Sequence, residues 1–249
     1  MNIKKQQADI LGCKVDLVNL NQAVGEVAAL LNTREKAAQI ITVNAEILYE
    51  ASKNPELTEV INSAHMVTPD GIGVVWAATQ LGGNPQGRVT GIELLEALCQ
   101  EGARQGWRMF FFGAAPGVAE QAADKLSSRY PGLLIAGTIH GYFSPEGEGD
   151  IIAAIKSAAP DILFVGLGAP RQEYWISQHK EELDVPVCIG IGGSFDVLSG
   201  LKKRAPELMI KLNLEWFYRL ASEPSRIKRQ MALPKFVWMI LRQKYGGRL

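Results

Sequence analysis

The sequence predicts an α/β protein built on a doubly wound, mostly parallel sheet with helices on both faces. Short apolar runs alternate with segments of helical pattern through most of the first 200 residues. The apolar runs are continuous rather than alternating, which is typical of strands buried on both faces. Turn residues such as the Tyr-Pro-Gly at 130–132 separate the segments. Because this alternation implies βαβ crossovers, we expect a Rossmann-like arrangement.

The expected elements follow in chain order. A stretch at 8–18 is expected to form a small N-terminal hairpin or an edge strand. The predicted strands of the main sheet are 39–45, 65–70, 108–114, 133–141, 161–168 and 186–193. Helical patterns occupy 89–105, 116–129, 150–158 and 170–182.

Composition indicates a folded protein of a reducing compartment. Of the 249 residues, 47% are hydrophobic and 21% are charged, which is enough apolar material for a core. Cys13, Cys99 and Cys188 are widely separated, so neither a zinc site nor a disulfide framework is expected. The N-terminus has no apolar core typical of a secretory signal, and no apolar run approaches the roughly 20 residues of a membrane span.

Charge divides the chain into two expected domains, an α/β domain at 1–200 and a basic amphipathic appendage at 201–249. Residues 1–201 carry 14 Lys and Arg against 23 Asp and Glu, whereas residues 202–249 carry 12 against 3. Apolar residues recur at i+4 spacing from Leu208 to Leu220, and Pro224 and Pro234 are expected to break the pattern into short helices.

The apolar run at 236–241 lies among basic residues and predicts contact with an anionic membrane surface. A packed helix pair with a solvated basic face, or an oligomer contact, remains the alternative. No recognised nucleic-acid motif is present, so nucleic acid is not an expected partner.

Glycine-rich segments follow four predicted strands, at 69–73, 111–117, 165–173 and 189–196. They include Gly113, Gly168 and Gly193. Ligands of open parallel sheets bind beyond the carboxyl ends of the strands, where glycine lets the backbone approach a phosphate. Four such segments at one edge predict a nucleotide or sugar-nucleotide site.

Several nucleotide chemistries lack their motifs. Arg171 and Phe195 stand where a dinucleotide fingerprint needs its third glycine. There is no Walker A lysine motif, no D-x-D pair to hold a metal against a sugar diphosphate, and no G-x-S-x-G elbow. The three histidines lack metal spacing, so no metal site is predicted.

Polar residues at the strand ends are the candidate lining of a pocket. They are Thr42, Asn44, Asp70, Arg88, Gln172, Ser194 and Asp196. Each has a simpler alternative role: Asn44 or Ser194 can cap a helix, and Arg88 or Asp196 can pair with an opposite charge. Asp70 can cap the helix that follows it, or it can act as a general base with the neighbouring glycines leaving room for its partner.

The segments TVNAEI, TPDGIG, GYF, GLGAPRQE and GGSFDVLSG followed by KRAP resemble the WecG/TagA/CpsF glycosyltransferase family. The likeness runs in order from about Asp9 to Pro206 and continues, more loosely, into the basic tail. It implies transfer of a sugar from a UDP-sugar donor to a polyprenyl-diphosphate-linked sugar at the cytoplasmic face of the plasma membrane, where the protein would be peripheral.

In the TagA-like branch the resemblance implies UDP-N-acetylmannosamine as donor and undecaprenyl-diphosphate-linked N-acetylglucosamine as acceptor, for the linkage unit of wall teichoic acid. Related members use the corresponding uronic acid for common antigen, or serve capsule synthesis, and the sequence leaves the choice of donor open. The implied chemistry is inverting and metal-independent, so no cofactor is expected. A self-associating form in solution is a further expectation.

The resemblance also implies roles for individual residues. Asp70 would be the base that deprotonates the acceptor hydroxyl. Thr42 and Asn44 would lie near the donor sugar and phosphate, and Arg88 and Gln172 would touch the sugar or the diphosphate. Three arginines of the tail would fold over the site, namely Arg219, Arg226 and Arg229.

Two other classes of function stay open from the residues alone. A short oxidoreductase is disfavoured by the missing third glycines. A non-catalytic, nucleotide-gated membrane adaptor would bind UDP without turnover, and its function would not change when Asp70 is replaced by asparagine.

Overall fold

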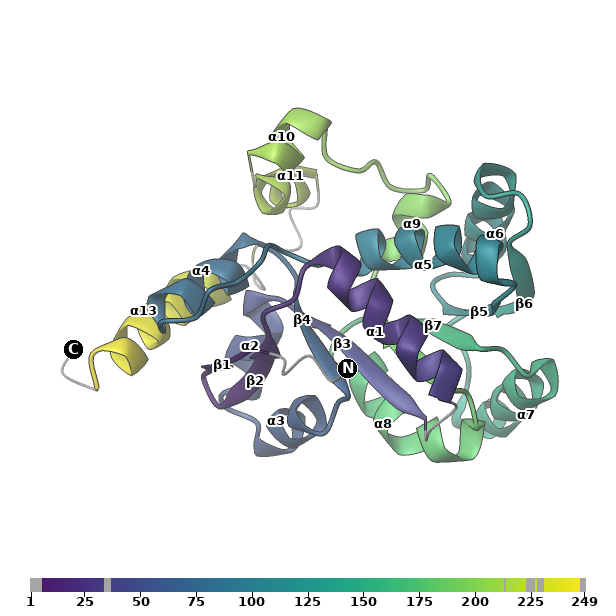
Figure 1. Ribbon diagram of the computed structural model, residues 1–249, viewed down its shortest axis with the longest axis horizontal. Coiled ribbons are helices and arrows are strands. Elements are labelled where there is room, and N and C mark those ends of the chain that lie inside the picture. Colours follow the sequence, from purple (N-terminus) through teal and green to yellow (C-terminus); the bar gives the residue numbers. More distant parts are fainter. Residues whose placement is uncertain (1–5, 34–36, 213, 223–226, 228–230, 247–249) are drawn as a thin grey trace.

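A computed structural model describes residues 6–33, 37–212, 214–222, 227 and 231–246. Its centre is a six-stranded parallel sheet with the order β4-β3-β8-β7-β5-β6 (Figure 1). The strands are β3 (Ala38–Val43), β4 (Met66–Pro69), β5 (Arg108–Gly113), β6 (Leu134–Ile139), β7 (Ile162–Gly166) and β8 (Val187–Gly190). The predicted fold class is therefore confirmed.

Helices cover both faces of this sheet (Figure 1). Along β5, Phe111 packs into the core beneath α1, α5 and α6, whereas Phe110 and Phe112 pack into the core beneath α7 and α8. Successive side chains of a strand point to opposite faces, so burial on both sides explains the continuous apolar runs. These helices are α1 (Leu20–Thr33), α5 (Gly91–Gln105), α6 (Val118–Arg129), α7 (Glu148–Ala158) and α8 (Arg171–Leu183).

The N-terminal hairpin covers the β4 edge of the sheet. Strands β1 (Gln7–Ile10) and β2 (Cys13–Asp16) pair antiparallel, as predicted for this segment. The buried Asp16 accepts a hydrogen bond through Oδ2 from the backbone N of Val67 in β4 at 2.8 Å. A carboxylate thus takes up a backbone donor of the edge strand that a neighbouring strand would otherwise pair.

The strands β3 and β8 are parallel neighbours in the sheet, but the chain continues from them to opposite sides. The chain leaving β3 continues through α2 (Ala45–Ala51) and α3 (Pro55–Asn62) to β4. The chain leaving β8 continues into α9 (Ser194–Leu198), which packs against α6 over the opposite face. Such a divergence opens a crevice at the carboxyl ends of the strands, where ligands of open α/β sheets bind.

The C-terminal segment consists of α10 (Glu207–Lys211), α11 (Glu215–Ser222) and α13 (Ala232–Lys244) among its described residues. The i+4 apolar pattern does not form one helix, because α10 ends before Leu212 and a new helix begins at Glu215. Pro234 does not break a helix either. It stands in the first turn of α13, where the missing backbone N–H has no partner to lose.

Helix α13 packs into the core of the protein. It packs against α2 and α4 (Ile72–Gln80), and its Phe236 and Ile240 are fully buried there. Gln243 holds its end to the hairpin, donating to Asp9 O at 2.9 Å and accepting from Leu11 N at 3.0 Å. Within the described ranges, no helix is both long enough and apolar enough to cross a membrane.

Candidate active site

Two cavities open at the carboxyl edge of the sheet, and the larger, with a volume of about 790 Å³, is here named the polar cavity. It lies beyond the carboxyl ends of β3, β4, β7 and β8, at the crevice between β3 and β8. It is lined by Thr42, Asn44, Glu46, Ile47, Tyr49, Glu50, Lys53, Asn54, Asp70, Thr90, Gly91, Ile92, Gly168, Ala169, Pro170, Gln172, Ile191, Gly192, Gly193, Ser194, Met231, Ala232 and Lys235.

The second cavity has a volume of about 430 Å³ and is here named the apolar cavity. Side chains of α4, α11 and α13 enclose it, which explains its apolar character. It is lined by Asn44, Ala45, Glu46, Asp70, Gly71, Ile72, Gly73, Trp76, Arg88, Glu215, Trp216, Leu233, Phe236 and Val237. Three polar residues, Asn44, Glu46 and Asp70, line both cavities.

Asp70 sits at this shared border with its backbone and side chain both held. Its N–H donates to Val43 O at 2.8 Å, and its Oδ2 accepts from Gly91 N, the first residue of α5, at 3.3 Å. A carboxylate at a helix N-terminus is stabilised in its charged form by the helix dipole. The alternative that Asp70 caps the next helix is wrong, because the cap of α4 is Gly71 and no side chain bonds there.

Two glycines make this arrangement sterically feasible. Gly71 has a φ of +98°, a conformation that side-chain-bearing residues rarely adopt. At Gly91, a Cβ would lie only 3.3 Å from Ile191 Cα and 3.4 Å from Thr42 Oγ1. Glycine thus lets the start of α5 approach β3 and the loop after β8, which brings its N–H to Asp70.

Thr42 is the last residue but one of β3, and Asn44 directly follows the end of that strand. Thr42 Oγ1 donates to Gly190 O at 3.2 Å, which ties β3 to the end of β8. Asn44 caps α2, since its Oδ1 accepts from the backbone N of Glu46 and of Ile47, both at 3.0 Å. The simpler role foreseen for Asn44 is thus observed, and its side chain also borders both cavities.

Gln172 fixes the loop between β8 and α9. Its Oε1 accepts from Gly192 N at 2.9 Å, and its Nε2 donates to Glu173 Oε1 at 2.8 Å. Both side chains are buried. Gly190 leaves room for them, because a Cβ there would lie 2.7 Å from the Gln172 amide. The lining of the polar cavity therefore rests on a buried polar pair.

Burial raises the pKa of the Glu173 carboxyl from 4.5 to about 7, although the hydrogen bond from Gln172 opposes the shift. The folded protein thus binds a proton at Glu173 that the unfolded chain has already released between these pH values. The contribution of Glu173 to the free energy of unfolding is therefore fully present below pH 4.5, and it is lost as the pH rises toward about 7.

We expect a Glu173→Gln variant to lose less unfolding free energy than the parent protein between about pH 5 and about pH 8. The difference should be about 1–3 kcal/mol, because one pKa unit corresponds to about 1.4 kcal/mol. Urea unfolding followed across this pH range measures it. Parallel curves for the two proteins would show that Glu173 is ionised throughout.

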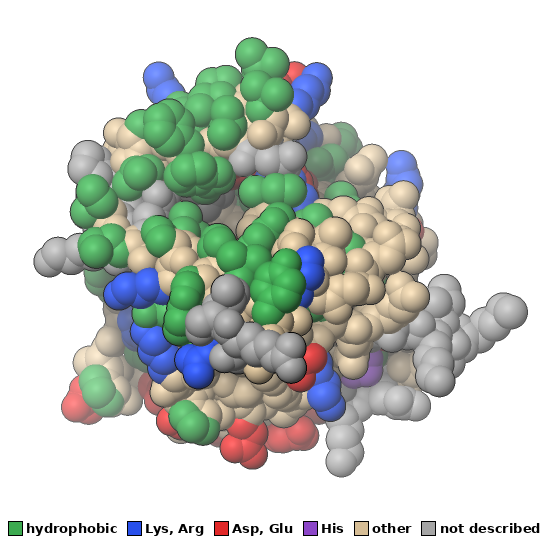
Figure 2. Space-filling view, turned by 90° about the vertical axis from the view of Figure 1, so that its left-hand side faces the viewer, with side chains coloured by type: hydrophobic (Ala, Val, Ile, Leu, Met, Phe, Trp, Pro, Cys, Tyr) green, Lys and Arg blue, Asp and Glu red, His purple; other side chains and the backbone are tan. Residues whose placement is uncertain are grey.

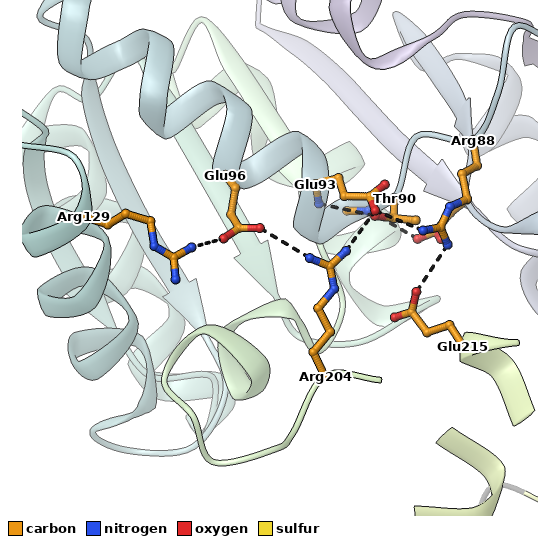
Figure 3. A network of polar contacts seen from close by, with 9 residues as sticks. Arg88, Thr90, Glu93, Glu96, Arg129, Arg204 and Glu215 are labelled. Atoms are coloured by element: carbon orange, nitrogen blue, oxygen red, sulfur yellow. Dashed lines mark hydrogen bonds and ion pairs between the residues drawn. The ribbon is translucent and has the colours of Figure 1, made fainter. Parts of the chain in front are cut away.

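Arg88 is engaged by two carboxylates (Figure 3). Its guanidinium contacts Glu93 at 3.1 Å and Glu215 of α11 at 3.3 Å. Glu93 also pairs with Arg204 at 2.9 Å, and Arg204 and Arg129 both contact Glu96. The pairing foreseen as the simpler role of Arg88 is therefore present, and it attaches α11 to the wall of the apolar cavity.

The structure distributes the remaining predicted residues unevenly. Gly168, Gly193 and Ser194 line the polar cavity, with Ser194 Oγ donating to Ile191 O at 2.6 Å rather than capping a helix. Gly113 lies outside the lining of both cavities, at φ +134° and in close contact with the backbone of Gly166. Asp196 is also outside and pairs with Lys202 at 3.1 Å.

The predicted arginines of the tail are only partly placed. Arg219 belongs to α11, but its side chain lies outside the described part of the chain. Arg226 and Arg229 lie wholly outside the described residues.

Sequence reasoning missed the contributions of Glu46, Glu215 and Trp216 to the cavities. In the sequence, Glu46 is indistinguishable from an ordinary acidic residue in the first turn of a helix. Glu215 and Trp216 belong to an amphipathic helix that packs against residues distant in the chain. Within the described residues, no group of three or more His, Cys, Asp or Glu is arranged to hold a metal ion.

Comparison with known proteins adds to this geometry. The profile described as "Glycosyl transferase WecG/TagA/CpsF family" matches residues 8–249. Three relatives bear the name N-acetylglucosaminyldiphosphoundecaprenol N-acetyl-beta-D-mannosaminyltransferase. The Bacillus spizizenii protein is 38% identical over 211 residues, 85% of this chain and 81% of its own length. The Bacillus subtilis protein is 40% identical over 207 residues, with shares of 83% and 80%. The Staphylococcus aureus protein is 36% identical over 239 residues, with shares of 96% and 93%. This chain therefore belongs to the WecG/TagA/CpsF family of glycosyltransferases.

Proposed function

We propose that this protein transfers N-acetylmannosamine from UDP-N-acetylmannosamine to undecaprenyl-diphosphate-linked N-acetylglucosamine, a step that begins the linkage unit of wall teichoic acid. The names of the relatives support this donor sugar and this acceptor. The observation that carries the proposal is the position of Asp70 where a polar and an apolar cavity meet. A sugar nucleotide suits the polar cavity, and a lipid-linked acceptor suits the apolar cavity.

The proposed chemistry is a single inverting displacement. The Asp70 carboxylate takes the proton from the acceptor hydroxyl while the hydroxyl oxygen forms a bond to the anomeric carbon of the donor. The bond from that carbon to the UDP oxygen breaks, and UDP leaves with the electron pair. The backbone N–H groups at Gly168 and Gly193, which line the polar cavity, supply dipoles toward the leaving diphosphate.

UDP release in the presence of EDTA tests this function with the proposed donor and a short-chain lipid-diphosphate N-acetylglucosamine acceptor. Product formation that needs both substrates and survives EDTA supports a metal-independent transferase. Binding of UDP without turnover would instead indicate a non-catalytic adaptor. Turnover confined to the uronic acid donor would keep the reaction class and correct the sugar.

We further propose that the protein works on an anionic membrane surface, where its lipid-linked acceptor is held. Large apolar side chains of the C-terminal helices and their linkers are exposed. They are Leu208, Leu212, Leu214, Trp216, Phe217, Ile227, Met231, Val237 and Trp238. Figure 2 shows the face of the molecule that lies on the left in Figure 1. Hydrophobic side chains gather over its upper part, with Lys and Arg side chains beside and below them. Apolar insertion flanked by basic residues is the pattern of an interfacial surface.

Charge placed in this surface should weaken membrane binding. A Leu208→Glu/Phe217→Glu variant is expected to bind anionic phospholipid vesicles at least about tenfold more weakly, because each buried apolar side chain contributes about 1.5–3 kcal/mol. Vesicle co-sedimentation measures the change. Leu134→Glu on the distant strand β6, also exposed in the parent protein, is the matched control. Equal binding by all three proteins would rule out this surface as the contact.

A further inference from the structure

Two lysines from distant parts of the chain converge on one tyrosine at the rim of the polar cavity. Lys53 follows α2, Lys235 lies in the first turn of α13, and Tyr49 belongs to α2. All three line the cavity. Lys53 Nζ lies 3.5 Å from the centroid of the Tyr49 ring. Both lysines also act on the phenol. A hydrogen bond with Lys53 is the main cause that lowers the pKa of Tyr49; desolvation opposes it, and the charge of Lys235 adds to the lowering.

The ammonium groups of this cluster differ from the other cations around the site. Arg88, Arg204 and Lys202 each have a carboxylate partner. Within the described part of the chain, neither Lys53 nor Lys235 forms an ion pair. The docking of α13 on α2 brings two like charges to one cavity, where they repel one another. An anion bound there attracts both ammonium groups and offsets that repulsion.

We propose that Lys53, Lys235 and the hydroxyl of Tyr49 form a binding subsite for the diphosphate group of a substrate. A diphosphate carries enough negative charge to face two ammonium groups at once, and each ammonium offers several donors to phosphate oxygens. Glu46 and Glu50 also line the polar cavity and carry negative charge. The two lysines are therefore the part of the cavity that suits an anion. The inference rests on the proposed function, in which donor and acceptor both carry a diphosphate.

Because Lys235 is carried by α13, the subsite is complete only when α13 is docked on α2. Helix α13 also separates the two cavities, with Lys235 facing the polar one and Phe236 and Val237 facing the apolar one. A diphosphate bound at Lys235 would therefore lie next to the apolar cavity, because the following residue, Phe236, belongs to the wall of that cavity. The subsite couples the C-terminal helix to substrate binding.

A Lys53→Gln/Lys235→Gln variant tests the subsite. Two constants are measured, namely the Kd of UDP by calorimetry and the KM of the lipid-diphosphate acceptor by UDP release. We expect one of them to rise about 10- to 100-fold, because each charge-assisted hydrogen bond to phosphate is a strong one. Lys156→Gln, an exposed lysine on α7, is the matched control. Both lysines are exposed, so the thermal unfolding midpoint should not change.

The pattern of change identifies the source of the diphosphate. A raised acceptor KM with unchanged UDP binding assigns the subsite to the lipid acceptor, and weaker UDP binding with an unchanged acceptor KM assigns it to the donor. A Lys53→Arg/Lys235→Arg variant should restore most of the loss in either case. If neither constant moves more than about twofold, below about 0.4 kcal/mol, the subsite does not exist.

Failure of the proposed function is distinguishable from failure of the subsite. If the parent protein transfers no sugar from any UDP donor, binding of inorganic pyrophosphate is measured instead. Pyrophosphate binding that the glutamine variant loses and the arginine variant keeps supports the subsite alone. Equal pyrophosphate binding by all variants overturns it.

Discussion

Replacing Asp70 with asparagine is expected to lower kcat by about 10²- to 10⁴-fold, the usual cost of losing a general base. Asparagine has nearly the same size and its carbonyl oxygen can still accept the hydrogen bond from Gly91 N. The start of α5 should therefore stay in place, and the KM of both substrates should change little. UDP release under saturating substrates measures the effect directly.

Asp124→Asn is the matched control for this prediction, since Asp124 is an exposed carboxylate on α6, away from both cavities. It should retain full activity. Full activity in the Asp70 variant as well would confine Asp70 to holding the N-terminus of α5. Glu46, the other carboxylate on the shared border, would then become the candidate base.

Much of this site follows from local sequence. Strands buried on both faces leave continuous apolar runs, so their order along the chain is readable, and the residue that ends such a strand must lie at the ligand-binding edge. Asp70 could be placed at that edge for this reason. Which helix its carboxylate would face could not, because Gly91 is 21 residues further on and approaches only through packing against Ile191 and Thr42.

Other features of the site depend on contacts between distant segments. The Arg88–Glu215 pair joins residues 127 apart, and nothing near either residue identifies the other. Glu173 has the same position in a helix as many solvated acids, yet it is buried and shares a hydrogen bond with Gln172. Local pattern cannot separate these cases, since burial is decided by the elements that pack over the residue.

The C-terminal helix shows the same limit on a larger scale. Its basic composition predicts a surface element, and the exposed Trp238 and Val237 agree with that view. The opposite side of the same helix is buried, with Phe236 only 1% exposed. A helix can serve a membrane surface and a core together when its two faces differ.

Phe236→Ala is accordingly expected to be among the most destabilising single changes in the chain. A buried phenylalanine replaced by alanine typically costs about 3–5 kcal/mol, from lost burial and from the cavity left behind. Activity should fall as well, because α13 positions the walls of both cavities. Urea unfolding of the full-length protein measures the first effect and UDP release measures the second.

Neighbouring substitutions separate packing from a general effect on α13. Val237→Ala, where the side chain is 40% exposed, should change the free energy of unfolding by less than about 1 kcal/mol. Phe236→Leu should recover most of the stability, since a large apolar side chain still fills the space. If Phe236→Ala unfolds at the same urea concentration as the parent protein, then α13 contributes nothing to the core. In that case any accompanying loss of activity would mean that the helix acts on the cavities alone, as a detachable cover whose docking is governed by substrate or membrane rather than by folding.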